Sequence, residues 1–226
     1  MATYDVTPLM MACQNNNPED VANFISKGDN VNALDSTNRT ALFYCSENTD
    51  ISCIEQLHKA KVNLNHQDKD GYSCLHVAVM CGNTVIVDYL IKNGADVNIT
   101  DSEMHSVIHW SVVCGQFSIF EYLIAKNADP ETADIHGAYP IHYAAQMCGK
   151  IDLMDEAVNR DHMKSLLILK KLIELKVKVD VEDFDQRNAI IWAASSGMLN
   201  FNLSIYIYRH FLLILDNTIS FDLKEN

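Results

Sequence analysis

The hydrophobic positions along the chain come in short bursts, which glycines and polar turns separate. In the stretch CLHVAVMCGNTVIVDYLIKNGADVNITD, the first burst covers residues 74–81 and stops at Gly82, a residue type that commonly ends helices. The second burst covers residues 83–92, has its apolar residues at helical spacing and ends at an Asn-Gly pair. The extended ADVNITDSEMHS that follows has the composition of a turn. The pattern therefore predicts two short helices joined to the next burst by a hairpin-like turn.

This pattern returns every 33 residues. The positions that show the period are Thr7, Thr40, Ser73, Ser106 and Tyr139; Leu9, Leu42, Leu75, Ile108 and Ile141; and Met10, Phe43, His76, His109 and His142. A sixth burst, NAIIWAASSG, begins at Asn188 after a step of 49 residues, so the fifth unit carries 16 additional residues. Helices this short are marginal alone in water and must stack on their neighbours. The sequence therefore predicts an all-α, one-dimensional solenoid of about six helix-turn-helix units.

The turn and helix motifs resemble those of ankyrin repeats. DGYSCLHVAVMCGN is the strongest match; MHSVIHWSVVCGQ and HGAYPIHYAAQMCG match well, QRNAIIWAASSG fairly, and VTPLMMACQ and NRTALFYCS more weakly. The resemblance covers about residues 5–197. It implies an ankyrin-repeat domain over residues 1–200, with units at about 5–35, 36–68, 69–101, 102–134 and 135–183 and a partial unit at 184–200. It also implies a non-catalytic scaffold module that binds a partner protein or peptide.

Two segments depart from the repeat. The fifth unit inserts KIDLMDEAVNRDHMK, about residues 150–164, which we expect to be an extra helical piece on a tolerant loop or, alternatively, a second docking site. The tail, residues 201–226, is rich in Ile, Leu, Phe and Tyr, where a terminal repeat should present a polar outer face. It is compatible with a divergent last helix, with a fragment end, or with a membrane-contacting segment, although it is too interrupted to predict a membrane span. The chain also starts almost directly in a repeat, which favours a fragment of a longer protein.

Composition limits the class of partner. Of the 226 residues, 48% are hydrophobic and 21% charged, which is enough apolar material for a packed core. The formal net charge of −13 argues against nucleic acid, because phosphate binding needs a basic surface. It permits a partner with a basic surface, although acidity also serves solubility alone. Seven cysteines without a C-x-x-C motif, and an N-terminus without a signal peptide, favour a reduced, cytoplasmic chain.

No motif for catalysis or for a cofactor occurs, because G-x-S-x-G, P-loop, H-E-x-x-H and glycine-rich dinucleotide patterns are all missing from the sequence. We expect no enzyme activity, no cofactor and no small-molecule substrate. His76, His109 and His142 recur on successive units, but stacked helices lie about 8–10 Å apart, too far for their side chains to share a metal ion. The resemblance implies instead that these histidines order the turns through hydrogen bonds to neighbouring backbone. Paired acids such as Asp68 and Asp70 lie in turns, where aspartate favours local hydrogen bonds.

The predicted partner site follows from the repeat register. Solenoids bind along an extended concave surface, and the resemblance places that surface at the hairpin tips and at the exposed ends of the first helices. The candidate partner-binding residues are Met80, Cys81, Val113, Cys114, Gln146 and Met147 at helix ends and Tyr72, Glu103 and His105 at hairpin tips. The apolar members would form one patch of the kind that marks a partner site, unless the helix ends tilt inward into the core. Trp110, Tyr143 and Trp192 share the position after the histidine, as groove-edge core or as interface anchors.

A second function class stays open on the sequence alone. The phrases LHVA and IHWS also occur in larger membrane proteins that carry ankyrin repeats, such as ankyrin-bearing palmitoyltransferases. The chain is alternatively the recognition portion of such an enzyme or channel, without itself contacting the membrane. A cysteine-rich acyltransferase motif, or several spans of about 20 apolar residues, beyond residue 226 would favour this reading. The resemblance further implies that Asn98, in its G-A-D-V-N turn, is the best match to the asparagines that an asparagine hydroxylase modifies.

Overall fold

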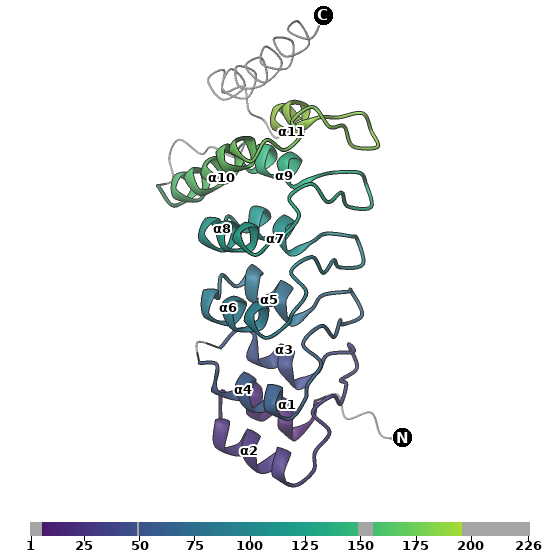
Figure 1. The fold of residues 1–226 in the computed structure, drawn as a ribbon, viewed down its shortest axis with the longest axis vertical. Helices are drawn as coiled ribbons and strands as arrows, with labels where there is room; N and C mark the ends of the chain where they lie inside the picture. Colours follow the sequence, from purple (N-terminus) through teal and green to yellow (C-terminus); the bar gives the residue numbers. More distant parts are fainter. Residues whose placement is uncertain (1–5, 49, 149–155, 196–226) are drawn as a thin grey trace, which may run out of the picture. The chain divides into compact units, whose positions relative to one another are not determined.

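The computed structural model describes residues 6–48, 50–148 and 156–195. These residues fall into two compact units, an N-terminal unit within Met1–Ala128 and a C-terminal unit within Asp129–Asn226. In both units helices alternate with turns (Figure 1).

The described part of the N-terminal unit is a stack of four helix pairs. They are α1 (Pro8–Gln14) with α2 (Pro18–Ser26), α3 (Ala41–Cys45) with α4 (Ser52–Lys59), α5 (Cys74–Met80) with α6 (Thr84–Lys92), and α7 (Val107–Val113) with α8 (Phe117–Ala125). First helices pack on first helices, α1 on α3, α3 on α5 and α5 on α7, and second helices pack on second helices, α2 on α4 and α6 on α8. The predicted solenoid of helix pairs is therefore confirmed in this unit.

Extended pairing among the described residues is limited to single bridges at the bases of two hairpin turns, Gln67 with Ser73 and Thr100 with Ser106. The all-α prediction is confirmed for the part of the chain that the structure describes. None of the helices described there combines the length and the hydropathy needed to cross a lipid bilayer.

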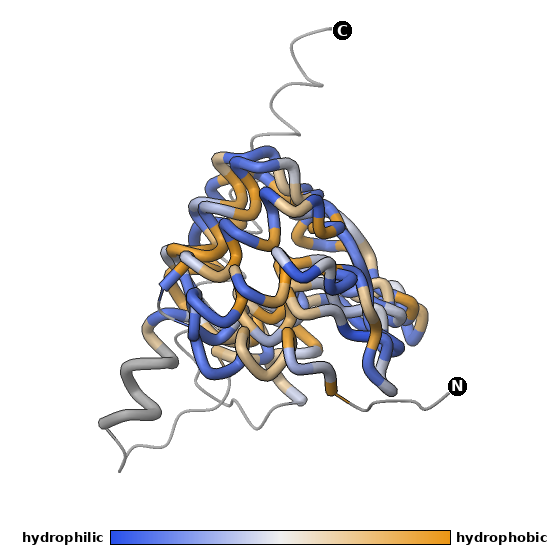
Figure 2. Tube along the Cα trace, turned by 90° about the horizontal axis from the view of Figure 1, so that it is seen from below, coloured by the Kyte–Doolittle hydropathy of each residue, from blue (hydrophilic) through white to orange (hydrophobic). Residues whose placement is uncertain are grey.

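The hydrophobic positions with the 33-residue period form the core. Leu9, Leu42, Leu75 and Ile108 are each no more than 2% exposed. In Figure 2 many hydrophobic positions lie on the inner sides of the helices, while the hairpin turns are largely hydrophilic. Full burial of one such side chain stabilises the fold by about 1.5–3 kcal/mol. Because equivalent helices stack, one leucine or isoleucine at this position in each repeat continues the same core.

Successive hairpin turns are tied together at their tips. The Lys69 backbone N–H donates to Thr37 O at 3.0 Å, and the Ser102 N–H donates to Asp70 O at 3.1 Å. Gly71 lies at the second of these junctions with φ of +81°, and a Cβ there would lie 2.3 Å from Ser102 N. Glycine is required because both the backbone conformation and the close approach exclude a side chain.

The C-terminal unit contains α9 (Pro140–Met147), α10 (Glu156–Glu174) and α11 (Ala189–Ser195) among its described residues. Helix α9 packs against both of the others. Residues 156–164 of the predicted insert belong to α10, so this part of the insert lengthens the second helix of the fifth repeat instead of forming a separate piece on the loop. The remaining insert residues, 150–155, and the tail at 201–226 lie outside the described residues.

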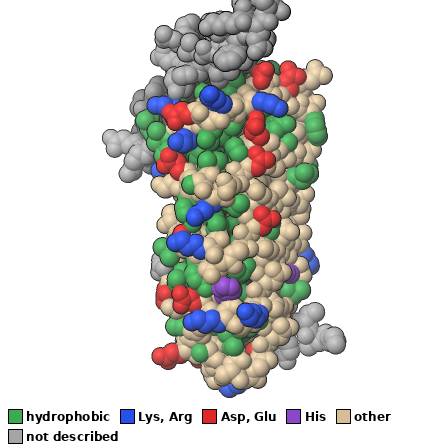
Figure 3. Space-filling model, in the orientation of Figure 1, with side chains coloured by type: hydrophobic (Ala, Val, Ile, Leu, Met, Phe, Trp, Pro, Cys, Tyr) green, Lys and Arg blue, Asp and Glu red, His purple; other side chains and the backbone are tan. Residues whose placement is uncertain are grey.

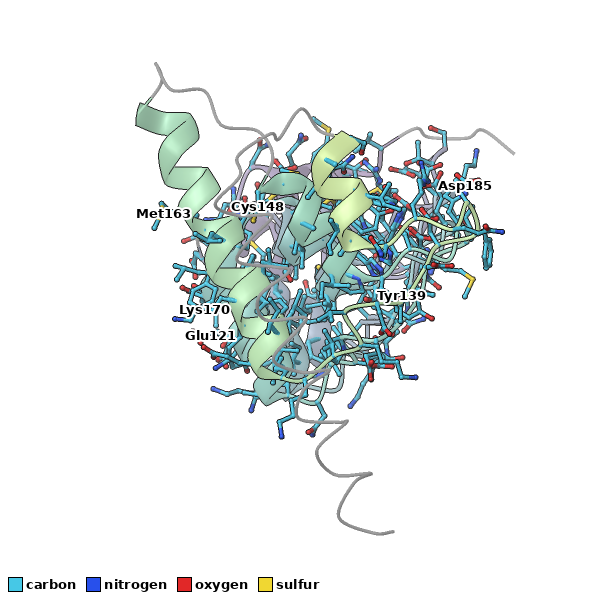
Figure 4. The ribbon with its side chains drawn as sticks, turned by 90° about the horizontal axis from the view of Figure 1, so that it is seen from above. Glu121, Tyr139, Cys148, Met163, Lys170 and Asp185 are labelled. Atoms are coloured by element: carbon cyan, nitrogen blue, oxygen red, sulfur yellow. The ribbon has the colours of Figure 1, made fainter. Side chains whose placement is uncertain are left out.

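The described side chains of α10, from Met163 onward, are buried on one side. Its inner side carries Ile168 and Leu172, both 0% exposed. Figure 4 shows Met163 and Lys170 on the side of α10 that faces away from α9, and Asp185 near the tip of the hairpin that precedes α11.

Candidate partner-binding surface

One aspartate shapes each hairpin turn, and these are Asp35, Asp68, Asp101, Asp134 and Asp183. One carboxylate oxygen accepts two backbone N–H bonds; Asp101 Oδ1 accepts from Glu103 N at 3.0 Å and from His105 N at 2.8 Å. Burial alone would raise the pKa of Asp101, but hydrogen bonds from His105 and Trp110 hold it below its usual value. Burial is likewise outweighed at Asp183, where bonds from neighbouring donors lower the pKa to about 2. The turn role predicted for the paired acids is confirmed.

In four of these turns, an aromatic side chain donates a hydrogen bond to the second carboxylate oxygen. The donors are Tyr44 Oη to Asp35 at 2.8 Å, Trp110 Nε1 to Asp101 at 3.0 Å, Tyr143 Oη to Asp134, and Trp192 Nε1 to Asp183 at 2.8 Å. Each ring lies nine residues after its aspartate and is half-buried. The sequence alone identifies three of these aromatics but misses Tyr44. A search for an aromatic residue nine positions after each turn aspartate finds all four.

The histidines of the repeat are occupied by backbone contacts. His76 Nδ1 accepts the Ser73 N–H at 3.1 Å, and His76 Nε2 lies 3.3 Å from His105 O in the next hairpin. His142 Nε2 lies 3.1 Å from Arg187 O in the C-terminal unit. Burial lowers the pKa of both His76 and His142. The expectation that they order the turns is confirmed, and within the described ranges no three His, Cys, Asp or Glu side chains are placed to hold a metal ion.

The helix-end patch consists of Met80, Cys81, Val113 and Cys114, at the C-terminal ends of α5 and α7. Because α5 packs on α7, these four residues lie on neighbouring helix ends. None of them is buried; Met80 and Val113 are half-buried, and both cysteines are exposed. Burial of the sulfur raises the pKa of the Cys81 and Cys114 thiols, so both stay neutral at physiological pH. The patch is therefore an apolar surface open to solvent.

The other two nominated helix-end residues, Gln146 and Met147, close α9 in the C-terminal unit. Both are half-buried, as Met80 and Val113 are in the N-terminal unit. They keep the predicted register, but they belong to a different unit from the helix-end patch.

The nominated hairpin-tip residues gather around Trp110. Tyr72 meets the Trp110 ring edge-on at 5.5 Å between centroids, and His105 does so at 5.8 Å. His105 Nδ1 also lies 3.4 Å from Asp101 Oδ2 and 3.7 Å from Glu103 Oε2. The Glu103 side chain is 65% exposed. The tips before α5 and α7 thus present an aromatic cluster beside a solvent-facing carboxylate.

Two open pockets adjoin these residues and share Tyr72 as a wall. The Val77 pocket holds about 390 Å³ and is lined by Gln14, Arg39, Phe43, Tyr44, Glu47, Tyr72, Val77, Met80 and Cys81. The tip pocket holds about 280 Å³ and is lined by Lys69, Asp70, Tyr72, Asp101, Ser102 and Glu103. The structure therefore joins half of the helix-end patch to the hairpin tips. Sequence reasoning missed Arg39, Phe43 and Val77; for Phe43 and Val77 the signal is a departure from the residue type that other repeats carry at the same position.

All seven cysteines are free, and five of them are buried. Cys13, Cys45 and Cys53 lie at the meeting of α1, α3 and α4, each 0% exposed. The contact of Cys45 with Cys13 and Cys53, together with burial, raises the pKa of the Cys45 thiol. These three thiols belong to the core packing.

The asparagine of the G-A-D-V-N turn links neighbouring repeats. Asn98 is exposed; its backbone N–H donates to Asp96 Oδ1 at 2.9 Å, and its amide nitrogen lies 3.5 Å from Asn127 O. Asn32 and Asn65 make the same link to the repeats that follow them. Hydroxylation of Asn98 stays a prediction.

Charged side chains of both signs are interspersed with hydrophobic ones on the face shown in Figure 3. That face therefore carries no field of a single sign.

A family model described as ankyrin repeats (3 copies) matches residues 9–101 and again residues 44–134. Among solved structures, the chain is similar to the crystal structure of the ankyrin repeat domain of Bcl-3, described as a unique member of the IkappaB protein family. That match has a TM-score of 0.69 and 21% sequence identity, and it covers 83% of this chain and 77% of the other. At this identity it is a likeness of fold alone. No curated protein matches the sequence significantly.

Proposed function

The chain belongs to the ankyrin-repeat family, and from this premise we propose that it binds a partner protein or peptide across the helix-end patch and the neighbouring hairpin tips. Ankyrin repeats are generally non-catalytic modules for protein–protein interaction. The alternative, that the chain is the recognition portion of a larger membrane enzyme or channel, stays a prediction and assigns the same binding task to this surface.

The observation that supports this location is the exposure of the helix-end patch. Met80 and Val113 end α5 and α7 and are half-buried, and Cys81 and Cys114 beside them face solvent. Apolar side chains gathered on an accessible surface are typical of partner sites. Methionine also adapts its shape to varied partners.

Replacing Met80 and Val113 together with glutamate tests the proposal. A partner must desolvate both charges, and an unpaired buried charge costs several kcal/mol, so we expect binding to weaken by about 100-fold or more. Folding should lose no more than about 1 kcal/mol, because neither side chain is in the core. The measurement is recovery of cross-linked partners from lysate by the wild type and the variant, together with thermal melting of both.

A matched control is available on the second helices of the same two repeats. Val85 on α6 and Ser118 on α8 are 33 residues apart and exposed. Val85→Glu with Ser118→Glu adds the same charge at the outer side and should leave partner recovery unchanged. Equal loss of partners in both double variants would mean that net charge, and not the helix-end patch, controls binding. A collapse of the melting transition in the Met80 and Val113 variant would mean that these residues stabilise the core.

A further inference from the structure

The hairpin that precedes α5 departs from the others at one position. Each of the other described turns pairs its aspartate with a tyrosine or tryptophan nine residues later, but the residue nine positions after Asp68 is Val77. Valine has no ring to fill this place and no donor for the carboxylate. The α5 repeat therefore lacks a side chain that its neighbours on both sides, with Tyr44 and Trp110, possess.

The free side of the Asp68 carboxylate is occupied from the preceding repeat. Arg39 Nε donates to Asp68 Oδ2 at 2.9 Å, and the Asp68 side chain is only 1% exposed. The same register position before α11 is Arg187, which pairs instead with the aspartate of its own turn, Asp183, and there Trp192 still supplies its ring. Arg39 thus replaces the missing hydrogen bond, but its side chain, 44% exposed, does not fill the volume of a ring.

That volume is the Val77 pocket. Its lining includes the rings of Phe43, Tyr44 and Tyr72 together with Val77 and Met80, and the polar or charged lining residues are Gln14, Arg39 and Glu47. A pocket of about 390 Å³ is within the range that small ligand groups occupy, from about 300 to 1,000 Å³. Aromatic walls favour an aromatic guest, because edge-to-face ring pairs add to the gain from burial.

The tip pocket, on the other side of Tyr72, has the opposite character. Asp70 and Glu103 are exposed there, and Lys69 is the basic residue among its lining residues. Asp101 also lines it, with both carboxylate oxygens engaged by the turn and by Trp110. Its excess of carboxylates complements a basic side chain, and solvent-exposed carboxylates attract such a group at a range of about 8–10 Å.

We propose that these two pockets bind one extended segment of a partner protein, with an aromatic side chain in the Val77 pocket and a lysine or arginine over Asp70 and Glu103. This proposal rests on the proposed function and specifies its ligand. The aromatic group of the partner takes the place that a tyrosine or tryptophan of the chain itself holds in the neighbouring repeats. It is the anchor, and the basic residue sets the direction of the segment across Tyr72.

A random-peptide phage library selected on the wild-type chain supplies the probe. We expect the selected peptides to share an aromatic residue followed or preceded, within a few positions, by a basic residue. No selected peptides, or a consensus without both features, would overturn the proposal. A selected peptide is then made synthetically, and its affinity is measured by fluorescence polarisation.

Val77→Trp closes the pocket from within and returns a ring to the α5 repeat. It should weaken the peptide by at least about 30-fold, the loss of one buried anchor, and leave the helical circular dichroism unchanged. Val77→Ala is the matched control, because it leaves the pocket open, and it should keep the affinity within about threefold. Equal binding by Val77→Trp and the wild type would overturn the proposal. If that binding is still lost in the Met80→Glu, Val113→Glu variant, the proposed function survives and only the pocket assignment fails.

Charge reversal tests the second contact. Asp70→Lys with Glu103→Lys should weaken the peptide by about 3- to 10-fold and flatten its salt dependence. Glu19→Lys with Asp29→Lys makes the same change in net charge at exposed positions on α2 and after it, and should change affinity less than twofold. Equal losses in both pairs would show long-range attraction only, and the basic contact would be rejected.

Cysteine alkylation gives a test that needs no variant. Cys81 lines the Val77 pocket and Cys114 does not, and both are exposed. A saturating peptide should slow the reaction of Cys81 with N-ethylmaleimide by about 10-fold or more and leave Cys114 within about twofold, since only a covered thiol is shielded from the reagent. Unchanged Cys81 reactivity would overturn the assignment. If Cys81 is protected at high protein concentration without peptide, a second copy of the chain occupies the Val77 pocket, and the proposal is overturned.

Discussion

Helices α3 and α5 stack on one another in the same hydrophobic register, but their first turns are held differently. At α5 the Ser73 hydroxyl accepts the His76 N–H at 3.3 Å, and the His76 ring accepts the Ser73 N–H at 3.1 Å, a reciprocal capping box. At α3 the capping residue Thr40 makes no such bond, and its hydroxyl, in a residue 1% exposed, has no partner within the described structure. The Phe43 N–H donates instead to the Thr40 backbone oxygen at 3.1 Å, and the Phe43 ring, in the place of the histidine, offers no acceptor for the Thr40 N–H.

The comparison shows that departures from the repeat motif on neighbouring helices lie together at one surface. Phe43 replaces the histidine of α3, and Val77 replaces the aromatic of α5, and both residues line the Val77 pocket. Two departures from the motif thus meet at one surface, on neighbouring helices. His66, from the hairpin before α5, meets the Phe43 ring edge-on at 6.3 Å between centroids, and its Nε2 lies 2.6 Å from Asn38 O. Natural sequences break local rules chiefly where function needs it and compensate nearby.

The largest expected effect is that of His76→Ala. The variant leaves the Ser73 N–H and the His105 carbonyl without their partner and opens a cavity at a side chain that is 0% exposed. We expect a loss of about 2–4 kcal/mol in the free energy of unfolding, measured by urea denaturation. His136→Ala, at an exposed hairpin position, is the control and should change it by less than about 0.5 kcal/mol. A similar small change in both variants would contradict the role given to the His76 contacts.

The sequence predicted the helix pairs and the core because they depend on the period and on burial, which residue types report directly. It also placed every nominated helix-end residue in a partly or fully exposed position. The sequence did not predict the Val77 pocket, because this pocket lies where the α5 repeat lacks an aromatic side chain that the neighbouring repeats have. In the sequence Val77 is an ordinary apolar residue. Only the structure shows that Tyr44 and Trp110, at the equivalent positions, bond their turn aspartates, whereas Asp68 is bonded by Arg39. The sequence also did not predict that part of the insert extends α10, because the residue types of the insert suit a separate helical piece and a longer helix equally well.

Ser73→Ala should have the next largest effect. It removes the capping hydroxyl of α5 but leaves the His76 ring in place to accept the backbone N–H. Loss of a serine cap costs about 1–2 kcal/mol. Thr7→Ala, at the equivalent capping position of α1, should cost the same or less, because α1 has one neighbouring first helix in the described part and α5 has two. A loss below about 0.5 kcal/mol for Ser73→Ala would show that the cap contributes little.

Thr40→Val should move stability in the opposite direction. Its hydroxyl is buried without a hydrogen bond, so a methyl group of nearly the same shape removes a desolvation cost and no contact. The extended backbone of this residue, with φ of −91° and ψ of 171°, suits a β-branched side chain. We expect a gain of about 0.5–1 kcal/mol by urea denaturation. A loss instead would mean that the Thr40 hydroxyl has a partner in solution, such as an ordered water, and that α3 is capped after all.

The smallest expected effect is a pH dependence of the free energy of unfolding to which α5 contributes and α3 does not. Burial lowers the pKa of His76 below its ordinary value of 6.5, so the folded chain keeps this ring neutral where the unfolded chain would protonate it. The stabilising contribution is therefore complete above pH 6.5 and is lost as pH falls from there toward the folded-state pKa. Between about pH 7.5 and about pH 5.5 the wild type should lose up to about 1 kcal/mol more in unfolding free energy than His76→Asn, since one pKa unit corresponds to about 1.4 kcal/mol. Helix α3, with Phe43 at this position, contributes no such dependence, and Phe43→Tyr should leave the pH profile unchanged. Identical pH profiles for the wild type and His76→Asn would mean that His76 titrates in the fold as it does in water, and the link between its burial and its neutral state would be wrong.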